Sequence, residues 1–108
     1  MHDSMKAKLS KLQERLAEIQ KLLIDSETIK DMDNYTLLNK EFADLKPIVD
    51  KFDEYNSVLA AINDANEILE SGDEDLKSLA EEELKESLDK PDKLEQEFKL
   101  MLLHKDSA

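Results

Sequence analysis

The 108-residue chain contains no cysteine, one glycine and two prolines, and aromatic residues make up only 5% of it. Without cysteine, neither a disulfide nor a thiolate metal site is possible. A single glycine excludes the glycine-rich loops that hold phosphate groups. Together with the 39% of residues that are charged, these scarcities predict long helices rather than a globule built from sheets.

Long apolar runs are also missing. The longest is Leu100-Met101-Leu102-Leu103, far short of the ~20 residues that a membrane span needs. The N-terminus lacks the apolar block of a secretory signal. We therefore expect a cytoplasmic protein without a membrane partner. Four apolar residues in a row exceed what an exposed helix end should show, so we expect another part of the intact protein to pack there. Without that part, the fragment can self-associate through Leu100–Leu103.

Negative charge is unevenly distributed. Residues 1–24 carry five Lys or Arg against three Asp or Glu, a net charge of +2, whereas residues 25–108 carry ten against 24, a net charge of −14. Direct nucleic-acid binding by most of the chain is therefore not expected, because such a surface cannot neutralise phosphates. Two explanations remain open: the acidic surface meets a basic protein surface, or it simply keeps a helical module in solution.

Apolar residues recur at helical spacing along most of the chain. Over residues 4–24 they alternate between four and three positions apart, which is the pattern of a helix packed along another helix. The same reasoning predicts helices at about 34–46, 47–70 and 74–103. Asn66 falls on an apolar row, where it either fixes the register of packing or faces solvent while Ala65 and Ile68 replace it. We favour the second, because an apolar stripe drifts around a straight helix.

Glycine and proline mark the expected breaks. Gly72 can take the left-handed conformation that ends a helix, and Asp73 can cap the next one, so we predict the turn of a helical hairpin here. Pro47 can begin a helix or kink a continuous one, and we favour a bend. Pro91 predicts a kink or a short break near residues 88–91, and apolar spacing that resumes in phase favours the kink.

Residues that carry chemistry are scarce. The two histidines, His2 and His104, stand near the ends of the chain, and neither belongs to a Glu-x-x-His pair. Carboxylates are abundant, as in Glu81-Glu82-Glu83, but their runs are typical of a solvated helix face, and no apolar pocket is expected that would shift a pKa. We therefore predict no catalytic, cofactor-binding or metal-binding residue, no cofactor and no enzymatic activity within this segment.

Several segments, in order, resemble the N-terminal domain of bacterial-type class I peptide chain release factors of the UAA- and UAG-reading type. Asn34–Val49 is similar to the family's Tyr-x-x-Leu-x-x-Glu-Tyr-x-x-Leu-x-Pro-Ile-Val segment, and Leu79–Leu84 to its Met-Ala-x-Glu-Glu-Leu. Leu100–Asp106 is similar to its Leu-Leu-Leu-Leu-Pro-Lys-Asp-Pro. The chain departs from the pattern at His104 and Ser107, where the family usually has proline. Leu9–Leu23 and Phe52–Tyr55 complete the match.

The resemblance implies that residues 1–108 form one helical domain at the N-terminus of a longer, multidomain release factor. The family's codon-reading Pro-x-Thr motif and its Gly-Gly-Gln motif, which promotes peptidyl-tRNA hydrolysis, are not in this sequence. In the family this domain projects toward the GTPase-associated region of the large ribosomal subunit and acts together with the class II release factor. The implied partners are therefore the ribosome and that GTPase.

These observations predict an all-α fold of three to four helices: an antiparallel hairpin with coiled-coil-like packing, and an N-terminal helix packed against it. The implied function is docking of a release factor during translation termination. The acidic turn is the expected partner contact, through Glu70, Asp73, Glu74 and Asp75. The alternative is a free-standing acidic coiled-coil adaptor or chaperone-like module, which would self-associate through its apolar stripes.

Overall fold

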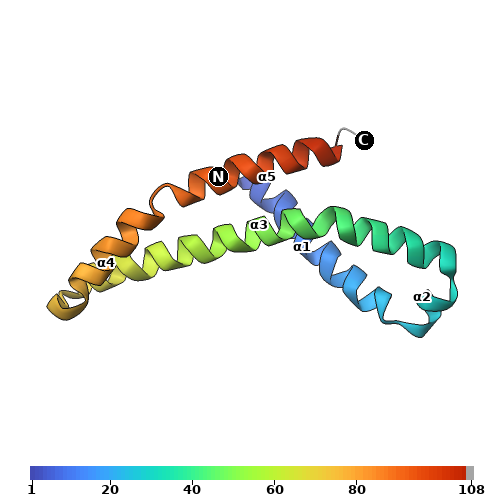
Figure 1. Cartoon of the computed structure of the whole chain (residues 1–108), viewed down its shortest axis with the longest axis horizontal. Coiled ribbons are helices and arrows are strands. Elements are labelled where there is room, and N and C mark those ends of the chain that lie inside the picture. Colours follow the sequence, from blue (N-terminus) through green and yellow to red (C-terminus); the bar gives the residue numbers. More distant parts are fainter. Residues whose placement is uncertain (107–108) are drawn as a thin grey trace. The chain divides into compact units, whose positions relative to one another are not determined.

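The computed structural model describes residues 1–106, which are helical except at short connections (Figure 1). Ser107, one of the two positions that depart from the family pattern, lies outside the described residues. No described helix is long and apolar enough to cross a membrane. The all-α prediction is confirmed, with the helices α1 Asp3–Leu23, α2 Ser26–Lys30, α3 Met32–Ser71, α4 Glu74–Ser87 and α5 Lys90–Asp106.

The described chain divides into two compact units. Among the described residues, the first unit holds 1–50 and 104–106, and the second holds 51–103. The long helix α3 contributes its N-terminal part to the first unit and its C-terminal part to the second.

In the first unit, α1 packs against the N-terminal part of α3 through a continuous apolar core. The predicted stripe of α1 supplies the buried Leu16 and Ile19. Phe42, Leu12, Leu22 and Leu23 pack around this core half-buried. The packing of an N-terminal helix is thereby confirmed, and the buried partners from α3 are Leu38, Leu45 and Val49.

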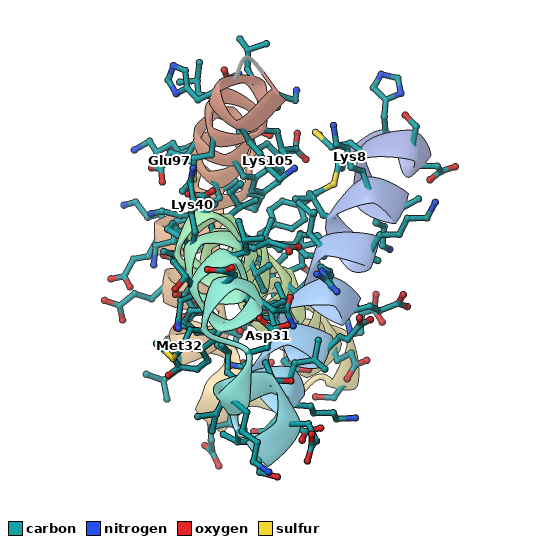
Figure 2. The ribbon with its side chains drawn as sticks, turned by 90° about the vertical axis from the view of Figure 1, so that its right-hand side faces the viewer. Lys8, Asp31, Met32, Lys40, Glu97 and Lys105 are labelled. Carbon is teal, nitrogen blue, oxygen red and sulfur yellow. The ribbon has the colours of Figure 1, made fainter. Side chains whose placement is uncertain are left out.

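The connection between α1 and α3 contains a short helix that the sequence pattern did not predict. The carboxylate of Asp25 accepts a hydrogen bond of 3.0 Å from the backbone N–H of Glu27 and so caps α2. Asp31 then caps α3, because its Oδ1 accepts from the backbone N–H of Asn34 at 3.2 Å. Figure 2 shows Asp31 and Met32 at the start of α3, where the Met32 side chain is 65% exposed.

The predicted bend that would separate helices 34–46 and 47–70 is wrong, because α3 continues through Pro47. A proline inside a helix removes one backbone hydrogen bond and costs roughly 3 kcal/mol. Pro47 is exposed, so water can reach the carbonyl that loses its partner. Burial of Leu45, Ile48 and Val49 on both sides of the proline keeps the helical path and offsets this cost.

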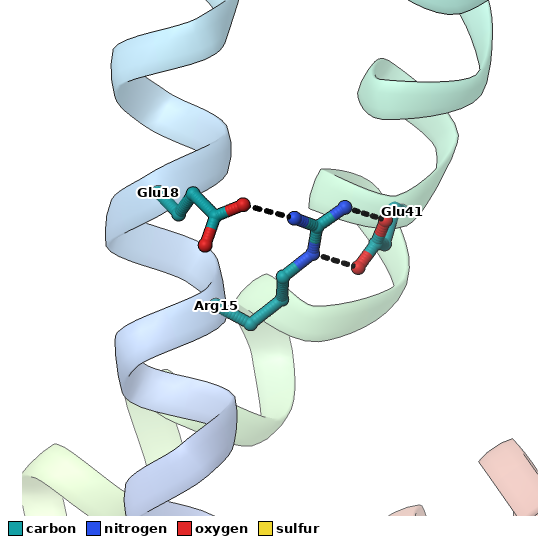
Figure 3. Close-up of polar contacts among 3 residues, drawn as sticks. All are labelled: Arg15, Glu18 and Glu41. Atoms are coloured by element: carbon teal, nitrogen blue, oxygen red, sulfur yellow. Dashed lines mark hydrogen bonds and ion pairs between the residues drawn. The ribbon is translucent and has the colours of Figure 1, made fainter.

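An ion pair links α1 to α3 (Figure 3). The Arg15 guanidinium donates from Nε to Glu41 Oε2 at 2.6 Å and from Nη2 to Glu41 Oε1 at 2.8 Å. Its third nitrogen donates to Glu18 Oε1 at 2.7 Å. This bidentate geometry between Arg15 and Glu41 is the strongest form of a surface ion pair. The hydrogen bonds from Arg15 lower the pKa of the Glu41 carboxyl below its usual range.

Stability of the first unit should therefore decrease in acid. A carboxyl with a lowered folded-state pKa contributes stability above its unfolded-state pKa and loses it as the pH falls through the folded-state value. Glu41→Gln should cost up to about 1 kcal/mol at pH 7, since both side chains are more than a third exposed, and less at pH 2. Urea denaturation at both pH values measures this, with the exposed Glu14→Gln as control. An equal cost at both pH values would contradict the assignment.

In the second unit, α4 and α5 run back along the C-terminal part of α3, as Figure 1 shows for α4. The antiparallel direction follows from the paired contacts: Phe52 meets Phe98, and Tyr55 Oη donates to Glu95 Oε1 at 3.0 Å. Lys51 Nζ lies 2.7 Å from Glu97. Burial, followed by the hydrogen bond to Glu95, raises the pKa of the Tyr55 phenol. The predicted antiparallel hairpin is thus confirmed.

The single helix expected at 74–103 is instead two helices, and the favoured kink is a break. α4 ends at Ser87, and α5 begins at Lys90. Pro91 therefore lies in the first turn of α5, where backbone N–H groups have no intrahelical partner and proline costs little. Breaking the helix at Leu88 and Asp89 avoids the clash of a proline ring with a preceding turn. Beyond the break, Leu94 is buried again.

The interpretation of Asn66 as a solvent-facing residue is confirmed. Asn66 is exposed, Ala65 is only 3% exposed, and Ile68 is half-buried. The apolar stripe has drifted around the straight helix by this point.

Candidate functional site

The turn between α3 and α4 is built by Ser71, Gly72 and Asp73. Gly72 has a φ of +75°, the left-handed conformation that glycine adopts without steric cost. The Ser71 hydroxyl donates to the backbone oxygen of Ile68 at 2.6 Å and accepts from the backbone N–H of Asp73 at 3.4 Å. Asp73 Oδ1 accepts from the backbone N–H of Asp75 at 3.0 Å and caps α4. The predicted turn and cap are confirmed.

Substitution of Gly72 should cost stability through the backbone alone, because a side chain at this position would meet no atom within 4 Å. We expect Gly72→Val to destabilise the hairpin by about 1–2 kcal/mol, the cost of a left-handed residue with a Cβ. Gly72→Asn should cost less, since asparagine tolerates this conformation. Thermal unfolding followed by circular dichroism measures both. Equal melting temperatures for Gly72→Val and the wild type would contradict the strain argument.

The four acidic residues predicted as the partner contact all lie at this turn. Glu70 belongs to the last turn of α3, Asp73 caps α4, and Glu74 and Asp75 form its first turn. All four are exposed. The Asp73 carboxylate has a structural role as the cap, to which Asp75 donates only its backbone N–H, and the acids in the first turn interact favourably with the helix dipole. We call these four residues the acidic turn.

Sequence reasoning missed an apolar groove next to the acidic turn. The groove lies between α3 and α4, has a volume of about 300 Å³ and is mainly apolar. Leu76 and Leu79 stand three positions apart on α4, the spacing of an apolar stripe that packs, yet they are 41% and 63% exposed. Opposite them on α3 stand Ala61 and Ala65, whose side chains are too short to cover both leucines. The two alanines are visible in the sequence, but which leucines they face is not.

The chemistry of this end of the hairpin is that of a contact surface. A smaller hollow of about 90 Å³ beside the turn, lined by residues that include Gly72, Asp73 and Lys77, is well below the size of a cofactor pocket. Among the described side chains, no group of three or more His, Asp or Glu residues is arranged to hold a metal ion. What remains is exposed negative charge beside exposed apolar surface, and both features are suited to binding another protein.

Residues 12–108 match the family model described as the PCRF domain. This chain belongs to the PCRF domain family. The PCRF domain described here is 39% identical over 105 residues to peptide chain release factor 1 of Ligilactobacillus salivarius. It is 41% identical over 102 residues to peptide chain release factor 1 of a Nitratiruptor species. The family resemblance seen in the sequence is therefore confirmed.

These alignments cover 96% and 94% of this PCRF domain but only 29% and 28% of the two relatives. The chain thus spans less than a third of the length of the release factors that it matches. No solved structure matches it with statistical significance.

Proposed function

We propose that this chain is the N-terminal helical docking domain of a longer, cytoplasmic peptide chain release factor. The observation that carries the proposal is the match of residues 12–108 to the PCRF domain, together with about 40% identity to two proteins named peptide chain release factor 1. The domain supports translation termination by protein contact, and codon reading and peptidyl-tRNA hydrolysis belong to other domains of the factor. Its partners are the GTPase-associated region of the large ribosomal subunit and the class II release factor.

The geometry of the second unit supports docking through the acidic turn. Glu70, Glu74 and Asp75 stand exposed at the end of a helical hairpin, where a partner surface can approach them without displacing the core. A basic protein surface complements this charge, and such complementarity mainly speeds association and fixes orientation.

Charge reversal at the turn tests this proposal in the full-length factor. The triple variant Glu70→Lys, Glu74→Lys, Asp75→Lys leaves the capping Asp73 in place. We expect several-fold weaker binding to ribosomes, or slower recycling by the class II factor, with the difference shrinking at high salt because exposed charges are screened. Single-turnover release and ribosome-binding assays at several salt concentrations measure it.

The control variant makes the same change in charge elsewhere: Glu14→Lys, Asp33→Lys, Asp44→Lys, all at exposed positions of the first unit. If both triple variants behave alike, net charge alone is responsible and the acidic turn is not the contact. The coding sequence beyond Ala108 separates this proposal from a free-standing adaptor, because a release factor must encode Gly-Gly-Gln there.

A further inference from the structure

The groove between α3 and α4 leaves apolar side chains uncovered within the second unit. Its lining is contributed by four residues of α3 and four of α4: Ala61, Asp64, Ala65, Ile68, Leu76, Leu79, Ala80 and Glu83. Leu76 and Leu79 are 41% and 63% exposed along one side, whereas Ala65 and Ala80 are each 3% exposed at the base. A contiguous apolar hollow with a polar rim is the usual form of a binding groove.

The walls of the groove favour a helix as its occupant. Both walls are α-helices whose backbone groups are paired internally, so they offer no free backbone N–H or C=O groups to an extended peptide. An extended segment buried there would leave its own backbone groups without partners, which is costly. A helix satisfies its own backbone and can place side chains at positions i, i+3 or i+4, and i+7 into such a groove.

The negative charge around the groove favours a basic partner. Asp64 and Glu83 stand at its two walls, and both are exposed. Residues 61–86, which contain the whole lining, carry ten Asp or Glu and two Lys, a net charge of −8. An amphipathic helix that carried Lys or Arg beside its apolar stripe would meet an opposite charge on each side.

The same charge disfavours a second copy of this chain. Two such grooves facing each other would bring together two segments that each carry a net charge of −8. Residues 1–24, with a net charge of +2, use the apolar stripe of α1 to pack against α3, so α1 has no apolar face left for the groove of another copy.

We propose that the groove binds a basic amphipathic helix of a partner protein, with apolar side chains seated between Leu76, Leu79 and Ile68. Asp64 and Glu83 interact with the basic residues on its two sides. This binding site adjoins the acidic turn but does not include its side chains. The proposal stands whether or not the chain acts in translation termination, because it rests on the groove and on the charges of Asp64 and Glu83 that line it.

Synthetic peptides test the proposal with the 108-residue chain. The probe is a peptide held helical by a side-chain bridge, with leucines at i, i+3, i+4 and i+7 and lysines on both flanks. One comparison peptide has the same composition with its leucines scattered around the helix, and another has glutamate in place of each lysine. Calorimetry gives the affinities, and amide chemical shifts locate the contact. We expect only the probe to bind, with shifts at residues 61–68 and 76–83.

Two variants identify the residues responsible. Leu76→Ala with Leu79→Ala should weaken the probe at least tenfold, whereas Met32→Ala with Leu37→Ala, at positions of similar or greater exposure in the first unit, should not. Asp64→Lys with Glu83→Lys should weaken it and flatten its salt dependence, whereas Glu14→Lys with Asp44→Lys should do so much less. Circular dichroism confirms that each variant is folded.

Three results would overturn the proposal. The scattered peptide could bind as tightly as the probe, or the leucine variant could bind it unchanged. Alternatively, sedimentation equilibrium could show that the wild type pairs with itself and that the leucine variant is monomeric, in which case the occupant is a second copy.

Discussion

Replacing Phe98 by alanine should destabilise the second unit by about 3–5 kcal/mol, the usual cost of removing a buried phenylalanine. Phe98 is 0% exposed. Its ring meets Tyr55 edge-on, with ring centroids 5.5 Å apart, and Phe52 edge-on at 6.2 Å. Such arrangements contribute about 0.5–1.5 kcal/mol beyond the area that they bury. Removal of the ring leaves a cavity that two rigid aromatic neighbours cannot fill.

Hydrogen exchange and urea denaturation measure this loss, with amides of residues 51–60 and 94–102 as local reporters. The matched control is Leu100→Ala in the same helix, because Leu100 is 56% exposed and its loss should cost well under 1 kcal/mol. If Phe98→Ala and Leu100→Ala were equally stable, the aromatic cluster would not hold α5 to α3.

Replacing Ile19 by alanine should cost about 2–5 kcal/mol in the first unit. Ile19 is 0% exposed and lies in the core between α1 and α3, beside Leu16. The ion pair of Arg15 with Glu41 adds little to the attachment of α1, because both side chains are more than a third exposed. The attachment of α1 therefore depends mainly on this core.

Amide exchange in residues 10–23 reports the effect directly, and the loss of helical circular dichroism on heating gives the stability. Gln20→Ala is the control, because Gln20 is the next residue along α1 and is exposed. Protection of α1 amides that survived Ile19→Ala would mean that the core with α3 is not what orders this helix.

The candidate site contains one feature that local sequence patterns predict and one that they do not. The acidic turn could be predicted because its parts are local: Gly72 permits one backbone conformation, and Asp73 caps the helix that follows it directly. The groove could not, because it depends on which side chains of α3 face Leu76 and Leu79. A stripe of leucines on α4 has the same spacing whether its partner covers it or, as with Ala61 and Ala65, leaves it open.

The two prolines show the same difference between local sequence effects and tertiary packing. The free-energy cost of a proline inside a helix follows from the residue type. The burial of neighbouring side chains that can offset this cost depends on the tertiary structure. At Pro47 the burial of Leu45, Ile48 and Val49 keeps α3 helical. Before Pro91 the helix ends instead, at Ser87. Leu88, in the break, is 67% exposed, so little burial would be gained by continuing the helix through it. Tertiary packing, not the residue type, decided between a continuous helix and two helices.

By itself the sequence determined the helical class, the hairpin turn, the negative charge of the second unit and the family, because each follows from composition, spacing or local backbone preference. The tertiary structure alone decided the continuity of α3, the break before α5 and the exposure of Leu76 and Leu79. These depend on contacts between residues far apart in the chain, and the energy of such contacts is set by the shape of the facing side chains.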